Sequence, residues 1–518
     1  MFTLGIKVPQ PLTADAYTVG SGTHVSSDAK DFSAYQVQAR KRPEWMDDQF
    51  KNAEALMGGP LESRFVFHGL SAILHDLFST RLTHEQIDEE KEFLQTFHAG
   101  NIPFSFDEKM LRRVVDECKG IAPIRIKALK DGATFFLGEP IIQIEGENGF
   151  GELAGYYESK LLQVWATSER ATLMRHWLDY NKALVKECTS AYLDDPTILF
   201  LAQLQTHDFG DRAGSCPQES ERLGLAQLTS HFGTDTCAAA YIAWKLNGKK
   251  PVGSSIKALA HRIVMGFPKE FQAYEALFNS EPAAFTSHVG DTNNFFRAVD
   301  NYLLPLAKKA ASTGGVIVAR PDSGDPTEQL LYVFNAAVDA GMFNIVHTGK
   351  KYRGMTNLKS IEGDGMQFKT VIDINNTLLE NKFSPIHCGI YGIGGFVRNI
   401  IQRDNTGMTM KLCAVGSSHR PTMKFSHTPG KGSIPGLAKI VREPGQPTVR
   451  SIDEPGQDEL VMAFDGTLGE VYQHTESFDT VRQRVLNDFH KFPVPNPENT
   501  CSAKIKALKK ALHHEFVD

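Results

Sequence analysis

Beyond about residue 156 the chain alternates between helical patterns and short apolar runs, and this alternation limits the folds open to it. A long helical pattern covers "SKLLQVWATSERATLMRHWLDYNKALV", and the runs "GGVIVA" and "PIHCGIYG" each precede a helix or a Gly-rich turn. Repeated units of this kind are typical of parallel strands with helical crossovers. The pattern therefore predicts an α/β fold and favours an irregular α/β barrel.

The first 155 residues carry a different, mixed pattern. The stretch "LSAILHDLFSTRL" has helical spacing, whereas "IAPIRIKAL" and "GEPIIQIEG" resemble strands. The segment 414–457 is rich in Gly, Pro and Ser, and we interpret it as loops that return toward the first domain.

Length, charge and cysteine usage exclude several classes of protein. A chain of 518 residues is long enough to bury an active site within two or three packed units. Its 55 Lys and Arg against 61 Asp and Glu give a net charge of -6, which disfavours a nucleic-acid or membrane-surface partner. The seven cysteines include no CxxC pair, which argues against a zinc site or a disulfide framework. Without a signal-peptide pattern or a bilayer-spanning apolar stretch, the sequence predicts a cytoplasmic protein.

The motif "VARPDSGDP" follows a β-branched run and places both signs of charge in one loop. Asp325 is suited to cap the next helix, with Glu328 three residues further on as in a capping box. Arg320 and Asp322 then lie at the carboxyl end of a parallel strand, where α/β proteins hold their chemistry. Local sequence supports equally well a simple ion pair between the two that closes the loop.

Other motifs could bind a flat ring or an anion. In "THDFGDRAGS", Phe209 could stack on a ring and Arg212 could hold an anion. Taken singly, the residues favour the simpler interpretation, with Phe209 packed in the core and Arg212 in a surface ion pair with Asp208 or Asp211. The Gly-rich stretches 363–365 and 391–395 could offer backbone N–H groups to phosphates, or could form tight turns. His261 lies among apolar residues, and only proximity to an acid such as Asp291 would make it a candidate for catalysis.

Taken in order, these motifs resemble the nicotinamide phosphoribosyltransferase family along essentially the whole chain. The matching stretches are "TADAYTV", "HDFGDRAGS", "FGTDT", "ALAH", "VGD", "ARPDSGDP", "EGDG", "YGIGGFV", "QRD" and "LHHEF". The resemblance implies a type II phosphoribosyltransferase fold, with a mixed α+β domain from residues 1–155 and 440–518 and an irregular α/β barrel over 156–439. It also implies a homodimer with active sites at the subunit interface.

The resemblance assigns a base-binding site. Phe209 and Tyr17, the latter from the partner subunit, would stack on the nicotinamide ring, whose product is a pyridinium cation that aromatic faces attract. Asp235 would accept a hydrogen bond from the carboxamide nitrogen. Arg320 would contact the base, and Asp322 would line the ribose and base side.

The same resemblance assigns a site for the donor, 5-phosphoribosyl 1-pyrophosphate. The residues implied for ribose and its 5′-phosphate are Gly363, Asp364, Gly394, Gly395 and Arg212. The basic residues implied for phosphate and pyrophosphate, some of them across the dimer, are Arg40, Arg403, Lys411 and Lys424. Mg²⁺ would bridge the leaving pyrophosphate, and attack of the pyridine nitrogen on ribose C1 would pass through an oxocarbenium-like transition state.

His261 matches the family's phosphorylatable histidine, which couples ATP hydrolysis to product formation, and Asp291 matches the carboxylate that orients it. Two positions depart from the family pattern. Ala260 stands where a glutamate usually precedes the histidine, and Asp211 stands where an aromatic is common. Both departures are compatible with weaker ATP coupling and with a changed donor pocket.

Three other functions remain open at the level of sequence. One is nicotinate phosphoribosyltransferase activity, against which Asp235 argues. Another is transfer of ADP-ribose from ADP-ribose pyrophosphate to nicotinamide, which gives the dinucleotide directly. The third is a catalytically silent signalling or scaffold homologue, which would be expected to lack Arg320, Asp322 or His261, whereas all three are present.

Overall fold

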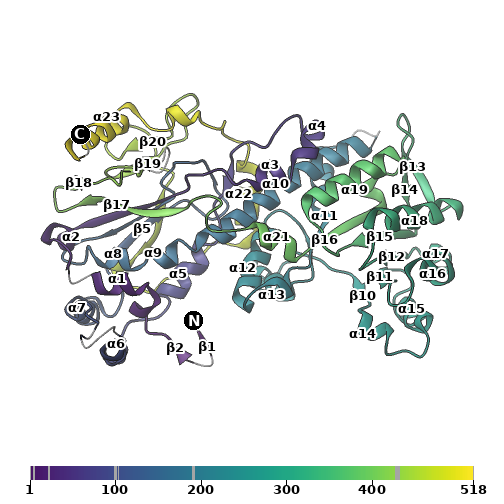
Figure 1. The fold of residues 1–518 in the computed structure, drawn as a ribbon, viewed down its shortest axis with the longest axis horizontal. Helices are drawn as coiled ribbons and strands as arrows, with labels where there is room; N and C mark the ends of the chain where they lie inside the picture. The colour runs from purple at the N-terminus through teal and green to yellow at the C-terminus, as the bar shows by residue number, and fades with distance from the viewer. Residues whose placement is uncertain are drawn as a thin grey trace.

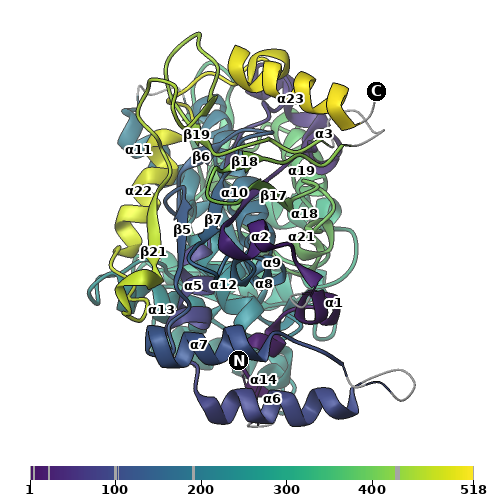
Figure 2. The same ribbon diagram turned by 90° about the vertical axis from the view of Figure 1, so that its left-hand side faces the viewer.

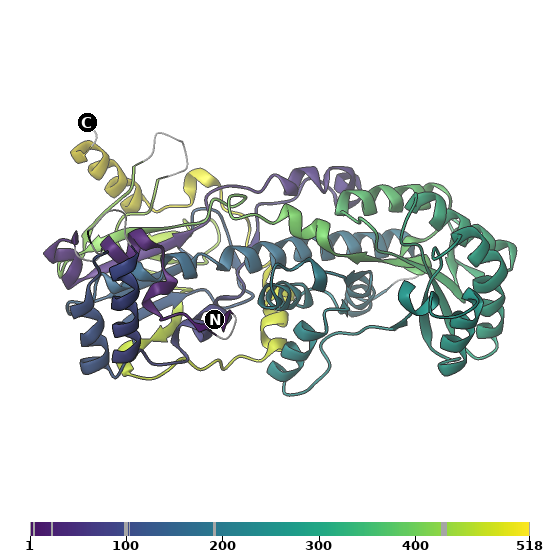
Figure 3. The same cartoon turned by 60° about the horizontal axis from the view of Figure 1, so that its bottom comes forward.

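The computed structural model describes residues 2–3, 6–21, 24–97, 102, 104–189, 193–425 and 432–516. The molecule is elongated, with one large sheet toward each end and the long helix α10 (Val164–Cys188) running between them (Figure 1). Most of the N-terminal and C-terminal chain gathers at one end, and the middle of the chain forms the other (Figure 3). Both ends of the chain thus build one domain.

The middle of the chain forms a sheet of seven parallel strands in the order β10-β11-β12-β15-β16-β8-β9. Its strands are β8 (Thr206–Asp208), β9 (Gly233–Thr234), β10 (Lys257–Ala258), β11 (Phe285–Val289), β12 (Val316–Arg320), β15 (Leu358–Glu362) and β16 (Gly389–Ile393). Ser254 forms a parallel bridge with Gly233 of β9, and the same segment continues into β10. The sheet therefore curls back on itself, and the predicted irregular α/β barrel is confirmed.

Helices connect the barrel strands on the outside (Figure 1). They include α11 (Asp195–Leu204), α12 (Pro217–Leu228), α13 (Cys237–Leu246), α15 (Glu270–Ser280), α17 (Leu304–Ala311), α18 (Pro326–Asp339) and α19 (Phe368–Glu380). The Asp325 side chain accepts a hydrogen bond from the backbone N–H of Glu328 at 2.7 Å, so the predicted cap of α18 is present. The apolar run "TILFLAQLQ" lies mostly in helix α11, and the strand β8 begins only after it.

The second large sheet has six strands in the order β18-β17-β3-β7-β5-β21, all paired antiparallel. Its strands are β3 (Ser33–Gln38), β5 (Ile124–Ala128), β7 (Ile142–Gly146), β17 (Thr409–Val415), β18 (Arg420–Pro421) and β21 (Val461–Asp465). Strands β17 and β18 fall inside the range 156–439 that the sequence assigned to the barrel. The chain returns to the end domain directly after α21 (Gly395–Ile400), because the backbone of β17 completes its hydrogen bonds against β3.

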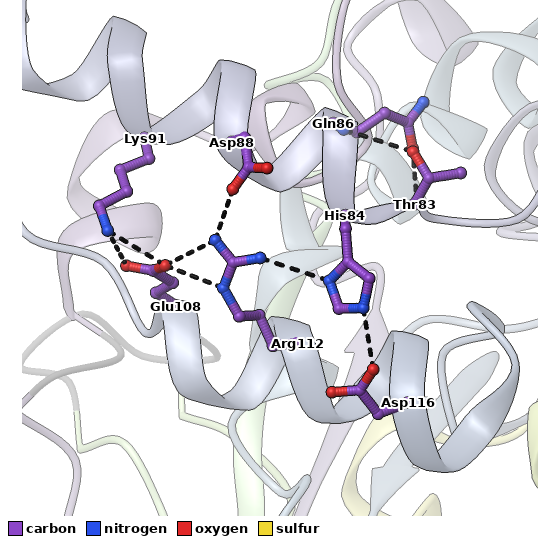
Figure 4. A network of polar contacts seen from close by, with 8 residues as sticks. All are labelled: Thr83, His84, Gln86, Asp88, Lys91, Glu108, Arg112 and Asp116. Carbon is purple, nitrogen blue, oxygen red and sulfur yellow. Dashed lines mark hydrogen bonds and ion pairs between the residues drawn. The ribbon is translucent and has the colours of Figure 1, made fainter.

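Helices α6 (His84–Thr96) and α7 (Glu108–Cys118) pack beside each other at the edge of the end domain (Figure 2). Charged side chains join them across the solvent-facing side (Figure 4). Arg112 pairs with Glu108 of its own helix and with Asp88 of α6, and His84 Nε2 lies 2.8 Å from Asp116 Oδ1. Exposed ion pairs of this kind contribute little each, so the apolar contacts beneath them supply most of the stability. Among the described residues there is no helix with the length and apolar character needed to cross a bilayer.

Candidate active site

The carboxyl ends of the seven parallel barrel strands meet at one edge of the sheet, and most predicted site residues follow those ends. His261 follows β10, Asp291 follows β11, and Arg320 ends β12 with Asp322 just beyond. The others are Gly363 and Asp364 after β15, Gly394 and Gly395 after β16, Phe209 and Arg212 after β8, and Asp235 after β9. Segments far apart in the sequence therefore converge on one site, as expected for an α/β barrel.

His261 lies between two carboxylates. Its Nε2 is 2.9 Å from Asp291 Oδ1, and its Nδ1 is 3.6 Å from Asp322 Oδ2. Asp291 is nearly buried, and its second oxygen accepts a hydrogen bond from Ser323 Oγ at 2.5 Å. The imidazole is one-third exposed, so it can be reached from solvent while one nitrogen is held by Asp291. This is the proximity to an acid that sequence alone could not establish.

Asp322 has a different electrostatic setting from Asp291. Burial raises the pKa of Asp322, and Asp291 and Asp364 raise it further, while the charges of Arg320 and His261 oppose this shift. Arg320 Nε is buried and has no hydrogen-bond partner within the described part of the chain. Arg320 and Asp322 thus place a positive and a negative charge at a half-buried edge of the barrel. An anionic or polar ligand interacts with these charges more strongly there than it would in water.

Asp235 is fixed through one of its two oxygens. Oδ1 lies 3.0 Å from His207 Nε2 and also accepts a hydrogen bond from Ser255 Oγ. Burial acts to raise the pKa of Asp235, but these hydrogen bonds and the nearby charges hold it below its ordinary value. The side chain is about half exposed, so Oδ2 can accept a hydrogen bond from a ligand. His207 and Ser255 are residues that sequence reasoning had not singled out.

The Phe209 ring lies directly over two glycines. A Cβ atom at Gly392 would come within 2.1 Å of Phe209 Cε2, and one at Gly363 within 2.6 Å. The ring is also edge-on to the His207 imidazole, with centroids 5.5 Å apart. Gly392 was not among the predicted site residues, although it lies inside the quoted stretch "YGIGGFV". It comes to lie against the Phe209 ring because strand β16 pairs with β8, and no local motif indicates that pairing.

Glu362 is a second site residue that sequence reasoning missed. Its side chain is buried, and Oε1 accepts hydrogen bonds from the backbone N–H groups of Gly363 at 2.9 Å and Asp364 at 3.1 Å. Burial raises the pKa of Glu362 to about 7. In the sequence, Glu362 is marked only as the first residue of "EGDG". A glutamate at the end of a strand does not by itself indicate a functional site, since its contacts are not known at that stage.

A small pocket lies where β8 and β16 end. Its lining includes the glycines Gly210, Gly214 and Gly394 together with the Arg398 side chain. Arg398 forms an ion pair with Glu219, and its Nη1 is buried without a hydrogen-bond partner among the described residues. Arg212 is exposed beside this pocket's residues in a short turn. Arg398 and the buried Arg170, neither of which the sequence had indicated, are thus arginines that line the pocket.

The remaining predicted residues lie elsewhere in the chain. Tyr17 belongs to helix α1 (Ala16–Ser21) of the end domain and is 69% exposed. Arg40 follows β3, where its Nε donates to the Gly407 carbonyl at 3.1 Å, and Lys411 lies on β17, 3.5 Å from Glu158. Arg403, which pairs with Asp404, and Lys424 lie close in sequence to β17 and β18. Within one chain, α1 and the six-stranded sheet stand apart from the barrel edge (Figure 1).

Comparison with known proteins agrees with this geometry. Residues 204–433 match the nicotinate phosphoribosyltransferase (NAPRTase) family. The chain is 28% identical over 366 residues to a protein named nicotinamide phosphoribosyltransferase from Xanthomonas campestris, covering 69% of this chain and 75% of that one. It is 24% identical over 299 residues to a Mycoplasma genitalium protein of the same name, covering 54% and 62% of the two chains.

Solved structures share the fold at low identity. Human nicotinic acid phosphoribosyltransferase superposes with a TM-score of 0.60 at 16% identity, covering 98% of this chain and 99% of that one. Nicotinate-nucleotide pyrophosphorylase from Pyrococcus furiosus gives a TM-score of 0.58 at 14% identity, covering 96% and 100%. These two similarities extend over both the barrel and the end domain.

Proposed function

We propose a specific reaction for this chain, which belongs to the NAPRTase family of phosphoribosyltransferases and is a pentosyltransferase. It transfers the phosphoribosyl group of 5-phosphoribosyl 1-pyrophosphate to nicotinamide, giving nicotinamide mononucleotide and pyrophosphate. The observation that carries the choice of base is Asp235, whose Oδ1 is held by His207 and Ser255 beside the Phe209 ring.

The acceptor is nicotinamide because Asp235 is an acceptor of hydrogen bonds. Oδ2 would accept one N–H of the carboxamide, while Phe209 stacks on the pyridine ring and Arg320 contacts the base. A nicotinate carboxylate would instead meet the negative charge of Asp235, which is costly unless one of the two takes up a proton. The names of the Xanthomonas and Mycoplasma relatives support the same choice.

The chemistry needs positioning and charge stabilisation rather than proton transfer. The lone pair of the pyridine nitrogen forms a bond to ribose C1, and the bond from C1 to the pyrophosphate oxygen breaks with its electron pair leaving on pyrophosphate. The pyridine nitrogen carries no proton, so none has to be removed. Asp322 and Asp364 would hold the ribose side and stabilise the developing positive charge on the sugar.

The residues present fit a magnesium ion held mainly by the donor's phosphates. Among the described residues, no group of three His, Cys, Asp or Glu side chains could hold a metal ion by itself. Mg²⁺ commonly binds through one or two carboxylates together with substrate phosphates. Asp322 and Asp364 would supply such carboxylates, and the ion would neutralise charge on the leaving pyrophosphate.

His261 is proposed as the residue that couples ATP hydrolysis to the reaction. Asp291 holds Nε2, so Nδ1 is the nitrogen available to accept a phosphoryl group from ATP. Asp291 would also stabilise the imidazolium character that develops as the phosphoryl group transfers. Ala260, the cap residue of the short helix α14 (His261–Val264), offers no side-chain charge next to it.

We further propose a cytoplasmic homodimer with shared sites. Tyr17, Arg40, Lys411 and Lys424 belong to the end domain, and a partner subunit would bring them to the barrel edge. The exposed Tyr17 ring would then complete the stack on the base opposite Phe209. The seven cysteines, each described as a free thiol, are compatible with a reducing compartment.

Two alternative reactions differ from this proposal in one substrate each. A donor with ADP-ribose in place of phosphoribose would suit a pocket altered at Asp211, and it would give the dinucleotide in one step. Nicotinate as acceptor is favoured by the family name and by the human structural neighbour.

A silent homologue is disfavoured because Arg320, Asp322 and His261 are all present at the barrel edge.

The test is to incubate the purified protein with each base and each donor and to identify the products by mass. Nicotinamide with 5-phosphoribosyl 1-pyrophosphate should give the mononucleotide, and the Asp322→Asn variant should give far less. Formation of the dinucleotide from ADP-ribose pyrophosphate, or a preference for nicotinate, would replace the proposal by the corresponding alternative. No product from any pair would favour the silent homologue.

A further inference from the structure

Glu169 is a buried carboxylate of helix α10 that binds two segments from other parts of the chain. The residue is 2% exposed, and its Oε1 accepts a hydrogen bond from Trp45 Nε1 at 2.6 Å, in the short helix α3 (Trp45–Asp48). The same oxygen accepts a hydrogen bond from Asn405 Nδ2, in the segment 401–407 between α21 and β17, which we call the connecting loop. Oε2 is buried without a hydrogen-bond partner in the described part of the chain. A carboxylate is costly to bury in this way, so its position calls for an explanation beyond packing.

The connecting loop is held from two sides. Asn405 Nδ2 also donates to the Ile400 carbonyl at 2.6 Å, which closes the start of the loop onto the end of α21. Near the other end of the loop, the Thr406 carbonyl accepts the backbone N–H groups of Arg40 at 2.8 Å and Lys41 at 2.9 Å, directly after β3. The loop therefore joins helix α10 to the six-stranded sheet of the end domain.

Two arginines are attached to the connecting loop. Arg403 lies on the loop itself, and its side chain is 64% exposed in an ion pair with the neighbouring Asp404. An exposed pair of this kind contributes little, so Arg403 can exchange Asp404 for an anionic ligand at small cost. Arg40, which the proposed dimer would bring to the barrel edge, donates from Nε to the Gly407 carbonyl at 3.1 Å. The same loop thus places both positive charges.

Helix α10 is a rigid support for this loop. It runs between the two large sheets, and Glu169 lies in its second turn (Figure 1). Groups that bind a ligand must be held within about 0.5 Å of their productive position, which side chains on helices achieve better than side chains on loops. Trp45 fixes the Glu169 carboxylate, so Asn405 bonds to an oxygen whose position is set. The contact between Glu169 and Asn405 therefore fixes the loop relative to the helix.

We infer that Glu169 is a positioning residue of the donor site: through Asn405 it holds the connecting loop, and with it Arg40 and Arg403, where they meet the phosphates of the donor. Glu169 itself touches neither the donor nor the base. The inference rests on the proposed function, since it takes the donor to be 5-phosphoribosyl 1-pyrophosphate. The role requires a hydrogen-bond acceptor and not a charge, because both N–H donors bond to Oε1.

The experiment compares full-length variants in steady-state kinetics, with the KM for the donor, the KM for nicotinamide, kcat and Tm measured for each. Glu169→Ala removes the acceptor, and Asn405→Ala removes the donor on the loop from a half-buried position. Glu169→Gln keeps a carbonyl oxygen for both N–H groups. Glu90→Ala is the matched control, because Glu90 is a buried carboxyl on α6 whose two oxygens have no hydrogen-bond partner among the described residues.

The expected changes are confined to the donor. In Glu169→Ala and Asn405→Ala the donor KM should rise by about tenfold, as for one weakened hydrogen bond to a charged group, while the KM for nicotinamide stays near that of wild type. Glu169→Gln should restore the donor KM, because the amide oxygen accepts the same two hydrogen bonds. Glu90→Ala should change Tm at most and leave both KM values as in wild type.

A double-mutant cycle with Arg403→Ala tests whether Glu169 acts through the connecting loop. Adding Glu169→Ala to Arg403→Ala should raise the donor KM by a smaller factor than in wild type, because one of the charges that Glu169 positions is already gone. Equal factors in the two backgrounds, or an unchanged donor KM in folded Glu169→Ala or Asn405→Ala, would overturn the inference and leave the proposed function intact. A wild type that forms no product from this donor would contradict both.

Discussion

His261 Nε2 lies 2.9 Å from Asp291 Oδ1, although the two residues belong to loops after different strands. If this pair couples ATP hydrolysis to transfer, His261→Ala should abolish stimulation by ATP and leave some basal transfer. The reason is that His261 is proposed to carry a phosphoryl group and not to act at ribose C1. The measurement is product formation with and without ATP, together with phosphate release.

The controls for this prediction separate coupling from folding. Asp291→Asn should reduce ATP stimulation less completely, because the amide can still bond to the imidazole but carries no charge to stabilise it. His75→Ala, which removes an exposed histidine on α5 (Leu70–Phe78), should behave as wild type. A wild type that neither hydrolyses ATP nor becomes phosphorylated would show that coupling is absent in this chain, in line with Ala260.

The close packing of Phe209 on Gly392 predicts a steric effect of a single methyl group. In Gly392→Ala the new Cβ would lie 2.1 Å from Phe209 Cε2, so the ring must move from its stacking position. Overpacking typically costs about 1–3 kcal/mol of stability. We expect a raised KM for the base, with a smaller change for the donor, and a lower Tm. Gly349→Ala is the control, because its Cβ would approach no nearer than 3.6 Å to His347. Unchanged base kinetics in Gly392→Ala would contradict the stacking role of Phe209.

Sequence patterns predicted the parts of the site that depend on local structure. The cap Asp325 and the β-branched run before it placed Arg320 and Asp322 at a strand end, as found. Contacts between loops were beyond local reasoning, because His261 meets Asp291 only once β10 and β11 pair in register. The resemblance to the family indicated the pair of His261 and Asp291. Neither the local patterns nor the resemblance indicated Glu362 or Arg398, because the surroundings of these two side chains form only when separate strands and helices pack together.

The domain boundary shows the same limit. The barrel ends at β16, but β17 still carries the apolar residues of a strand, so nothing in its own sequence says which sheet it joins. Pairing with β3, more than three hundred positions earlier, decides the matter. Such long-range pairing depends on the whole chain and is the hardest feature to read from a single sequence.

Two ion pairs should differ sharply in their effect on stability. Arg442 and Glu139 are both buried and joined by two hydrogen bonds, so Arg442→Ala leaves a buried carboxylate unpaired, at a cost of about 3–5 kcal/mol. Arg112→Ala, in the exposed network of Figure 4, should cost less than about 1 kcal/mol. Thermal unfolding of both variants checks this, and a larger loss for Arg112→Ala would mean that the network is more than a surface feature.

Shared active sites can be tested by subunit mixing. Tyr17→Ala and Asp235→Ala should each be nearly inactive, because each removes one wall of the base site. In a hybrid dimer one of the two sites contains neither substitution, so co-refolded or co-expressed chains should regain part of the activity, up to about a quarter of wild type for random mixing. Mass spectrometry of the intact hybrid confirms that it forms. A hybrid that forms and stays inactive would show that each chain builds its own site.

The preference for the amide over the acid is the sharpest consequence of Asp235. Oδ1 is committed to His207 and Ser255, so Oδ2 is the atom left to accept the carboxamide N–H. A hydrogen bond to a charged acceptor contributes about 1.5–3 kcal/mol, which corresponds to roughly ten- to 150-fold in kcat/KM. Asp235→Asn and Asp235→Ser should lower kcat/KM for nicotinamide by that order. They should also relax rejection of nicotinate, since the like charge is gone and Phe209 still stacks on either ring.

The ratio of kcat/KM for the two bases is the quantity to measure, because a general loss of activity cancels in it. Ser255→Ala provides the matched comparison: it removes one donor to Oδ1 but keeps the charge of Asp235, so activity should fall while nicotinate stays excluded. If the ratio shifts in Ser255→Ala as much as in Asp235→Asn, geometry and not charge selects the base. A wild type that prefers nicotinate, or a ratio unmoved by either Asp235 substitution, would remove Asp235 from the role assigned to it.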